Sequence, residues 1–257
     1  MRRALCTFLL ATLPLSVAGA AMAGTLIGTD APDRLQGTPS PDQLYGEGGN
    51  DSLLGFGSHD YLEAGSGNDS VDGGGGIDLI VGGTGNDTIN GGDDGDVVYA
   101  GAGEDQVLGG QGNDQLFGQD GTDRLFGGAG ADRLYASLGA DFVDAGSGND
   151  TIFAEGAGIT VLAGGGNDIV SALGGPVAVQ GGGGHDRIRT GSGNDTASGG
   201  PGRDSVATGG GDDILDMHDG RRDRVNCGAG RRDSVYADDV DLIARCENRL
   251  QADPPLR

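Results

Sequence analysis

The sequence predicts an all-β fold built from a short repeated unit, and three observations support that prediction. Glycine accounts for 56 of the 257 residues, while Trp is absent and only five Tyr and six Phe occur, too few for a core of large side chains. An Asp recurs every nine residues, and an apolar residue follows most of these positions by two. Such a period is typical of a solenoid, in which each unit buries its apolar side chain against the next unit.

The nine-residue register runs from Asp33 to Asp213 without insertion or deletion. Nineteen of its 21 positions are Asp, and the exceptions are Ile159 and Val177. The residue two places later is Leu, Val or Ile everywhere except at Ala197, and Gly stands two places earlier in 16 of the 21 units. A register kept over this length indicates that one structural unit is repeated along nearly the whole chain.

Each unit divides into a turn and a strand. Its first six positions are rich in Gly, Asn and Asp, which suit a turn because Gly adopts positive φ angles freely and Asn tolerates them. The last three positions have the form x-U-x, where U is apolar. Because side chains alternate along a strand, U faces the interior and its neighbours face solvent. We therefore expect one turn and one three-residue strand per unit.

The full pattern, G-G-x-G-x-D-x-U-x, resembles the nonapeptide repeats of the RTX family, the haemolysin-type calcium-binding repeats. Residues 82–90 and 109–117 match it at every fixed position. The resemblance implies a right-handed parallel β-roll, a two-sheet β-solenoid with 18 residues per coil and calcium between the turns of successive coils. With about 4.8 Å between adjacent strands, some ten coils would form a rod roughly 50 Å long.

The negative net charge of the chain also indicates a cation as its partner. The formal net charge is −23, which argues against nucleic acid and anionic membrane surfaces and favours cations. In a roll with 18-residue coils, the Asp residues would form two columns of carboxylates that repel each other. Calcium relieves this repulsion because it accepts six to eight hard oxygen ligands, including carboxylates and turn carbonyls. We therefore expect folding to be coupled to calcium binding.

Counting Asp pairs that lie 18 residues apart gives up to about 16 calcium sites. The turns before Asp60 and Asp141 lack glycines that the repeat pattern has, so we place less weight on them. An alternative is that the carboxylates only form turn hydrogen bonds in a metal-free solenoid. The expected metal ligands are Asp51, Asp69, Asp78, Asp87, Asp96, Asp105, Asp114, Asp123, Asp132, Asp150, Asp168, Asp186, Asp195, Asp204 and Asp213.

The two ends of the chain differ from the repeats. Residues 1–23 have two Arg, a short apolar run and an Ala-Met-Ala ending, which predict a secretory signal peptide and no membrane span after its cleavage; an uncleaved anchor or a short buried helix is the alternative. Residues 24–216 would form the roll. Residues 217–257 would form a C-terminal cap closed by a disulfide between Cys227 and Cys246, since an even pair in an exported chain favours a bridge over two free thiols.

No catalytic motif accompanies the repeats. The sequence lacks a G-x-S-x-G elbow, an H-E-x-x-H motif and a Walker lysine, and the three His residues are isolated. A carboxylate-based glycosidase is the enzymatic rival, but the Asp columns are expected to serve the metal. We predict a protein without enzymatic activity, secreted to the extracellular space or cell surface, with a structural role.

Two surface features suggest partners besides calcium. Aromatic residues recur 18 apart at the last position of the unit, where they either stack across strands or form a strip for self-association or for binding polysaccharide. Nine of the 16 basic residues lie between Arg203 and Arg257, where they either belong to the cap or dock an anionic partner. The aromatic positions are Tyr45, Tyr99, Phe117, Tyr135 and Phe153.

Overall fold

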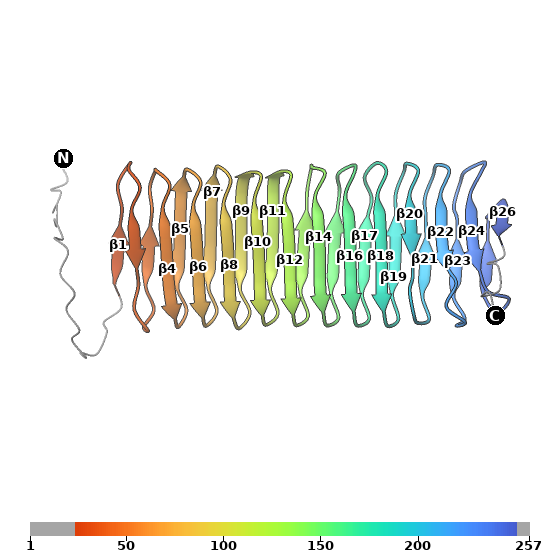
Figure 1. Cartoon of the computed structure of the whole chain (residues 1–257), viewed down its shortest axis with the longest axis horizontal. Helices are drawn as coiled ribbons and strands as arrows, with labels where there is room; N and C mark the ends of the chain where they lie inside the picture. Colours follow the sequence, from red (N-terminus) through yellow and green to blue (C-terminus); the bar gives the residue numbers. More distant parts are fainter. Residues whose placement is uncertain (1–23, 251–257) are drawn as a thin grey trace, which may run out of the picture.

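Two parallel β-sheets run the length of a flat rod in the computed structural model, which describes residues 24–250 (Figure 1). The predicted signal peptide, residues 1–23, lies outside this range. Odd-numbered strands form one sheet of 13 strands and even-numbered strands the other. The odd sheet contains β1 (Thr25–Ile27), β3 (Gln43–Tyr45), β5 (Tyr61–Ser66), β7 (Leu79–Thr84), β9 (Val97–Gly103), β11 (Gln115–Gly121), β13 (Arg133–Ala136), β15 (Thr151–Ala154), β17 (Ile169–Ala172), β19 (Arg187–Thr190), β21 (Ser205–Ala207), β23 (Arg224–Asn226) and β25 (Leu242–Ala244). The even sheet contains β2 (Arg34–Gln36), β4 (Ser52–Gly57), β6 (Ser70–Gly75), β8 (Thr88–Asp93), β10 (Gln106–Gln111), β12 (Arg124–Ala129), β14 (Phe142–Ser147), β16 (Thr160–Gly165), β18 (Ala178–Gly183), β20 (Thr196–Ser198), β22 (Ile214–Met217), β24 (Ser234–Ala237) and β26 (Asn248–Leu250).

The coil of the roll contains 18 residues. Each strand pairs in parallel with the strand two places further along the chain, so that Leu62 lies beside Ile80 and Ile80 beside Val98. Consecutive strands in the sequence belong to opposite sheets, and the turns between them form the two edges of the rod. Within the described residues there is no helix. The prediction of an all-β, two-sheet parallel solenoid with 18 residues per coil is confirmed.

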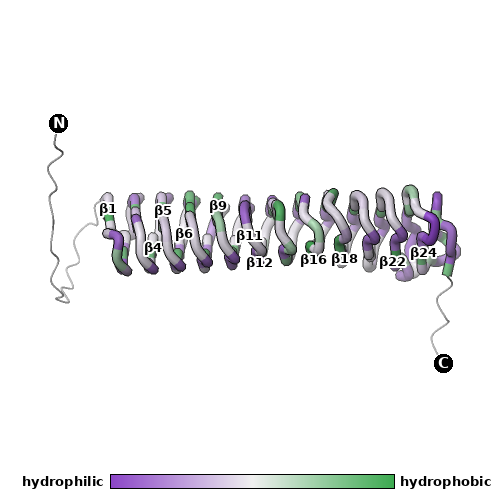
Figure 2. The backbone as a smooth tube through the Cα atoms, turned by 90° about the horizontal axis from the view of Figure 1, so that it is seen from above, coloured by the Kyte–Doolittle hydropathy of each residue, from purple (hydrophilic) through white to green (hydrophobic). Residues whose placement is uncertain are grey.

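The core is a narrow double row of apolar side chains between the sheets. The U residues point inward and are buried throughout the body of the roll, as at Leu44, Val98 and Leu116, each 0% exposed. The tube in Figure 2 alternates between apolar and polar segments along the whole rod, as expected when one side chain per unit faces the interior.

Most central strands are longer than the three residues predicted. In β10 the strand passes the U residue Val107 and continues through Gly109 and Gly110 to Gln111, and its burial alternates along the way. The strand can continue because the first position of nearly every unit is a small residue, Gly or Ala, that fits in the interior; the exceptions are Thr190 and Thr208. At Ala64 and Ala100 this residue is completely buried.

The C-terminal segment continues both sheets. Strands β23 to β26 lie beyond residue 216, so each sheet has 13 strands, where the sequence predicted some ten coils. After Asp213 the Asp residues are spaced by ten, at Asp223 and Asp233. The turns accommodate this spacing, since Val206 pairs with Val225 at a separation of 19 and Leu215 with Val235 at a separation of 20. About 4.8 Å between strands gives a rod of about 60 Å.

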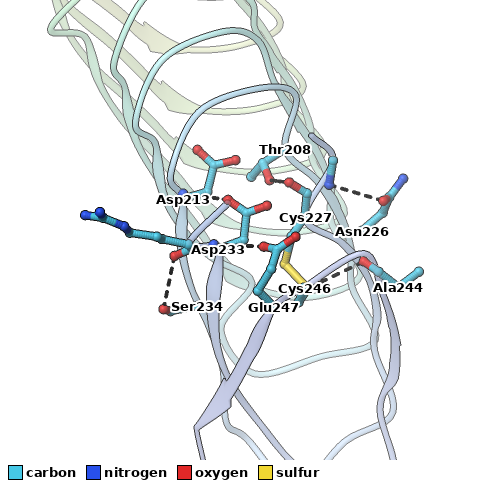
Figure 3. The surroundings of a disulfide bond; sticks show 11 residues. Thr208, Asp213, Asn226, Cys227, Asp233, Ser234, Ala244, Cys246 and Glu247 are labelled. Carbon is cyan, nitrogen blue, oxygen red and sulfur yellow. Dashed lines mark hydrogen bonds between the residues drawn. A yellow bond between two sulfur atoms is a disulfide. The ribbon is translucent and has the colours of Figure 1, made fainter. Parts of the chain in front are cut away.

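A disulfide joins Cys227 to Cys246 at this end, as predicted (Figure 3). Cys227 is completely buried at the end of the core, and its carbonyl accepts a hydrogen bond from the Thr208 hydroxyl at 2.9 Å. The bond thus ties the final strands to the last coil of the core. Residues 24–250 include no helix long and apolar enough to cross a membrane.

Breaking the Cys227–Cys246 bond is expected to lower the free energy of unfolding by about 3 kcal/mol, because the bond closes a loop in the unfolded chain. The measurement is thermal unfolding in excess calcium, with and without a reductant. A double Cys→Ser variant is the control, since the reductant should not change its unfolding temperature. An equal unfolding temperature for the oxidised and reduced chain would contradict a stabilising role.

Candidate metal centre

The recurring Asp closes each turn immediately before a strand, and its side chain points into the roll. Asp69, Asp96 and Asp114 are 3%, 0% and 0% exposed. The carboxylate binds the neighbouring coil: the backbone N–H of Asp69 donates to Asp87 Oδ1 at 2.9 Å, and that of Asp96 to Asp114 Oδ1 at 2.7 Å. The backbone carbonyl of Asp69 also accepts a hydrogen bond from Thr88 N–H at 2.9 Å. Each Asp therefore links one coil to the next through both its main chain and its side chain.

All sixteen Asp pairs counted in the sequence are joined by this N–H···Oδ1 bond, at 2.7 to 3.0 Å. The predicted metal ligands thus lie in two arrays, one on each edge, of which one is continuous and the other is interrupted. One edge contains Asp42, Asp60, Asp78, Asp96, Asp114, Asp132, Asp150, Asp168, Asp186 and Asp204. The other contains Asp33, Asp51, Asp69, Asp87, Asp105, Asp123 and Asp141, and after an interruption Asp195 and Asp213.

The interruption occurs at Ile159 and Val177, as the sequence shows. Their side chains take the inward position of the missing Asp residues and are 1% and 4% exposed. Val177 N–H still donates to Asp195 Oδ1 at 3.1 Å. Apolar burial therefore replaces a buried carboxylate at these two turns, and the stack continues.

Both edges extend beyond the sixteen Asp pairs counted in the sequence. Asp204 N–H donates to Asp223 Oδ1 at 2.8 Å, and Asp223 N–H to Asp241 Oδ1 at 3.0 Å. On the other edge the series ends with Asp233, whose N–H donates to Glu247 Oε2 at 3.0 Å (Figure 3). The ten-residue spacing to Asp223 and Asp233 is visible in the sequence but lies outside the nine-residue count. Asp241 and Glu247 were missed because they do not keep either spacing, although Asp241 still precedes an apolar residue by two places.

Along most of the roll, the second oxygen of each carboxylate has no hydrogen-bond partner. A buried carboxylate oxygen without a partner destabilises the fold unless a cation or proton compensates it. The buried Oδ2 atoms without a partner belong to Asp51, Asp60, Asp69, Asp78, Asp87, Asp96, Asp105, Asp114, Asp123, Asp132, Asp141, Asp150, Asp168, Asp186, Asp195, Asp204, Asp213, Asp223 and Asp233.

The first two turns are different because a Thr replaces the glycine four places before the Asp. The backbone N–H and hydroxyl of Thr29 donate to Asp33 Oδ2 at 2.6 and 2.8 Å. Thr38 makes the same two bonds to Asp42 Oδ2, at 2.5 and 2.8 Å. The Oδ2 atoms of these two carboxylates are therefore hydrogen-bonded by the protein itself.

Glycine brings main-chain carbonyls close together beside the carboxylates. Gly83 and Gly85, in the turn before Asp87, have φ angles of 114° and 120°, which L side chains rarely adopt. A Cβ at Gly85 would overlap the carbonyl oxygen of Gly67 in the preceding coil. The same overlap recurs from coil to coil, so a row of carbonyl oxygens runs along each edge where a larger residue could not fit.

Burial disfavours the ionised form of these carboxylates when no cation is bound. Burial raises the pKa of Asp78, Asp87 and Asp96 from 3.8 to about 7; hydrogen bonds from neighbouring main-chain N–H groups oppose the shift, and nearby Asp carboxylates add to it. The pKa of Asp114 rises to about 6 for the same leading reason. At neutral pH the metal-free columns therefore carry charge that the fold disfavours.

The residues present fit a hard cation. In the described part of the chain, no three carboxylate, His or Cys side chains converge as a ready metal cluster. A cation at the columns would therefore be held by Asp carboxylates together with main-chain carbonyl oxygens. An all-oxygen set of this kind suits Ca²⁺, which accepts carboxylates and carbonyls in flexible geometry, and does not suit Zn²⁺, which prefers Cys and His.

A family model describes this arrangement. The model for the RTX calcium-binding nonapeptide repeat matches residues 27–55, 57–80, 81–116, 117–152 and 180–215, more than half of the chain. The chain therefore belongs to the family of proteins with RTX calcium-binding nonapeptide repeats. The segment left unmatched between residues 152 and 180 contains Ile159 and Val177, where the Asp series is interrupted. No curated protein matches the chain.

The metal-free roll is expected to be more stable in acid than at neutral pH. The folded-state pKa of residues such as Asp87 lies above the ordinary value of 3.8, so protonation of these residues stabilises the fold. This contribution to the free energy of unfolding is fully present below about pH 4 and is lost as the pH rises through about 7. Circular dichroism with excess chelator between pH 3 and 8 measures the effect. A metal-free β-spectrum that strengthens as the pH rises from 4 to 8 would contradict it.

Substituting a glycine at a crowded carbonyl should be costly, whereas its neighbour should tolerate the change. Gly166 has φ 139° and a Cβ there would overlap the Gly148 carbonyl oxygen, but a Cβ at Gly165 meets nothing within 4 Å. We expect Gly166→Ala to lower the free energy of unfolding in calcium by about 1 to 3 kcal/mol. Gly165→Ala is the matched control and should change it little. Equal effects in chemical denaturation would show that the close carbonyl approach is unimportant.

Proposed function

We propose that this chain is a secreted calcium-binding repeat protein, without catalytic activity, whose roll folds when calcium binds to the aspartate columns. The observation that carries the proposal is the series of nineteen buried Oδ2 atoms that lack a hydrogen-bond partner. Their repetition along both edges indicates one common ligand rather than isolated defects. Membership of the RTX calcium-binding repeat family supports calcium as that ligand.

The proposed role of calcium is to stabilise the fold. Along most of the core there is one large apolar side chain per nine residues, so burial of apolar surface offsets only part of the conformational entropy lost on folding. Ionised carboxylates add repulsion within each column. Calcium would neutralise these charges and bind to Oδ2 atoms that otherwise have no partner, so the binding free energy would contribute to folding.

A non-catalytic role is supported by the position of the carboxylates. A glycosidase needs two carboxyl groups that flank a substrate, and one of them must exchange a proton with it. In this roll the Asp side chains point between the sheets, and Asp96 and Asp114 are completely buried. A polymer on the surface of the roll would not reach them. We propose a structural or surface-associated role, outside the cell.

The segment boundaries expected from the sequence complete this proposal. Residues 1–23 would direct export and be removed, residues 24–216 would form the calcium-dependent roll, and residues 217–257 would close its end. The disulfide and the Glu247 carboxylate at the end of the Asp series support a capping role for the last segment.

Four of the five predicted aromatic positions form a stacked ladder on the odd sheet, whereas Tyr45 lies against Tyr61 with its ring tilted by 52°. Tyr99, Phe117, Tyr135 and Phe153 lie on adjacent strands with ring centroids 4.5 to 5.2 Å apart and interplanar angles of 7 to 15°. Because neighbouring rings cover each other's faces, this geometry favours the cross-strand stacking interpretation. Binding of polysaccharide, or self-association, through the ladder stays a prediction.

A calcium titration tests the proposed function. In excess chelator at pH 7 we expect a far-UV circular dichroism spectrum of a largely unfolded chain, and in millimolar calcium the spectrum of β-structure. Magnesium should be less effective because it demands stricter geometry and retains its waters. A β-rich spectrum in chelator that calcium leaves unchanged would contradict the proposal.

A charge-removing variant separates a metal ligand from a turn hydrogen bond. Asp96→Asn keeps an oxygen that can accept the N–H of Asp78 but removes the negative charge. We expect a higher calcium midpoint for folding and a metal-free state that is no less stable than that of the parent chain. If the carboxylates served only as hydrogen-bond acceptors, the calcium midpoint would not change.

A further inference from the structure

The C-terminal end of the roll has an arginine-lined hollow on the outer face of the odd sheet. Its volume is about 350 Å³, within the range of sites for small molecules. Figure 2 shows hydrophilic residues concentrated at this end of the rod, around β22 and β24. The hollow is lined by Arg203, Asp204, Ser205, Arg222, Arg224 and Leu242.

The strand register explains why a hollow forms here. Ser205 on β21 lies between Arg187 on β19 and Arg224 on β23, so a short side chain stands between two long ones on the surface of the sheet. Arg203 and Arg222 occupy corresponding positions of successive coils, each immediately before the inward-facing Asp. Adjacent coils are about 4.8 Å apart, so the positive charges lie close together around Ser205.

These arginines have no carboxylate partner within residues 24–250. The ion pairs in that range are His218–Asp238 and Arg249–Asp239. Asp204 also lines the hollow, but its side chain is 2% exposed and its Oδ1 accepts the N–H of Asp186.

The carboxylate of Asp219, in the same turn as Arg222, is also engaged. Its oxygens accept the main-chain N–H groups of Gly202 and Arg221, each at 2.7 Å. A chain with a formal net charge of −23 thus presents a cluster of unpaired guanidinium groups around an open hollow.

We propose that this hollow binds an acidic sugar residue, presented by a carboxylated or sulfated polysaccharide. Guanidinium groups bind carboxylate and sulfate oxygens through two parallel hydrogen bonds, which gives both strength and orientation. The Ser205 hydroxyl can donate to or accept from a sugar hydroxyl, and Leu242 provides an apolar wall for the ring. The acidic remainder of the roll repels a polyanion, so binding is confined to this end of the rod.

The hollow lies beside one calcium column, because Asp204 belongs to that column and also lines the hollow. The carboxylates of the columns face the interior, whereas the arginines of the hollow are exposed. The site would give a calcium-stabilised rod one end that attaches to an acidic matrix and a long body that does not.

Isothermal titration calorimetry in calcium with a chondroitin sulfate oligosaccharide tests the proposal. We expect binding by the parent chain, and about tenfold weaker binding for each of Arg203→Ala, Arg222→Ala and Arg224→Ala, since each removes charge-assisted hydrogen bonds. Arg222→Lys should also weaken binding because Lys cannot form the paired contact. Ser205→Tyr should abolish it by filling the hollow while every charge remains.

Arg133→Ala is the matched control, because Arg133 follows its Asp on the odd sheet as Arg224 does but lies outside the hollow. It should bind as the parent does, and circular dichroism confirms that each variant is folded. No binding by the parent chain, or equal binding by all variants, would overturn the proposal. Binding of single-stranded DNA with the same affinity, and with the same weakening in the Arg→Ala variants, would also overturn the proposal. It would show that the hollow attracts any polyanion. If free glucuronate binds as tightly as the oligosaccharide, the result would support the site and identify free sugar acids as its ligands.

Discussion

The structure depends on one hydrogen bond, from the backbone N–H of an Asp in one coil to the carboxylate of the Asp in the next. It recurs at 2.7 to 3.0 Å along both edges, as between Asp69 and Asp87 or between Asp132 and Asp150. The bond sets the coil register, since a shift by one residue would place the carboxylate outside and the U residue in solvent. It also requires each carboxylate to be buried, and the remaining features of the roll follow from that burial.

Burying one carboxylate per turn imposes an electrostatic cost that the protein alone does not offset. Only one oxygen is hydrogen-bonded along most of the roll, and burial raises the pKa of residues such as Asp123 to about 7. Glycine at the crowded positions keeps main-chain carbonyl oxygens nearby, which adds further ligands of the kind that calcium accepts. The buried carboxylates that destabilise the metal-free fold are thus the groups that would bind a cation.

The two ends of the rod are stabilised by protein groups that differ from those of the repeats. At the N-terminal end, Thr29 and Thr38 donate two hydrogen bonds each to the second carboxylate oxygen. At the C-terminal end, Glu247 accepts the last N–H of one edge, and a disulfide joins the final strands to the core. Open ends of a solenoid expose unpaired strands, so turns stabilised by protein groups are suited to these positions.

Much of this molecule was determined by the sequence itself, because turn formation and strand alternation are local properties. The nine-residue period predicted the all-β solenoid, the inward U residues and the break at Ile159 and Val177, and the sixteen Asp pairs lie where their spacing placed them. Tertiary structure decided the rest. Stacking alone shows that one carboxylate oxygen is bonded and the other is not, that strands lengthen where Gly or Ala fits inside, and that Asp241 and Glu247 continue the series despite an altered period. The arginine hollow likewise exists only because residues 18 and 19 apart become neighbours, a proximity that depends on which coil lies against which.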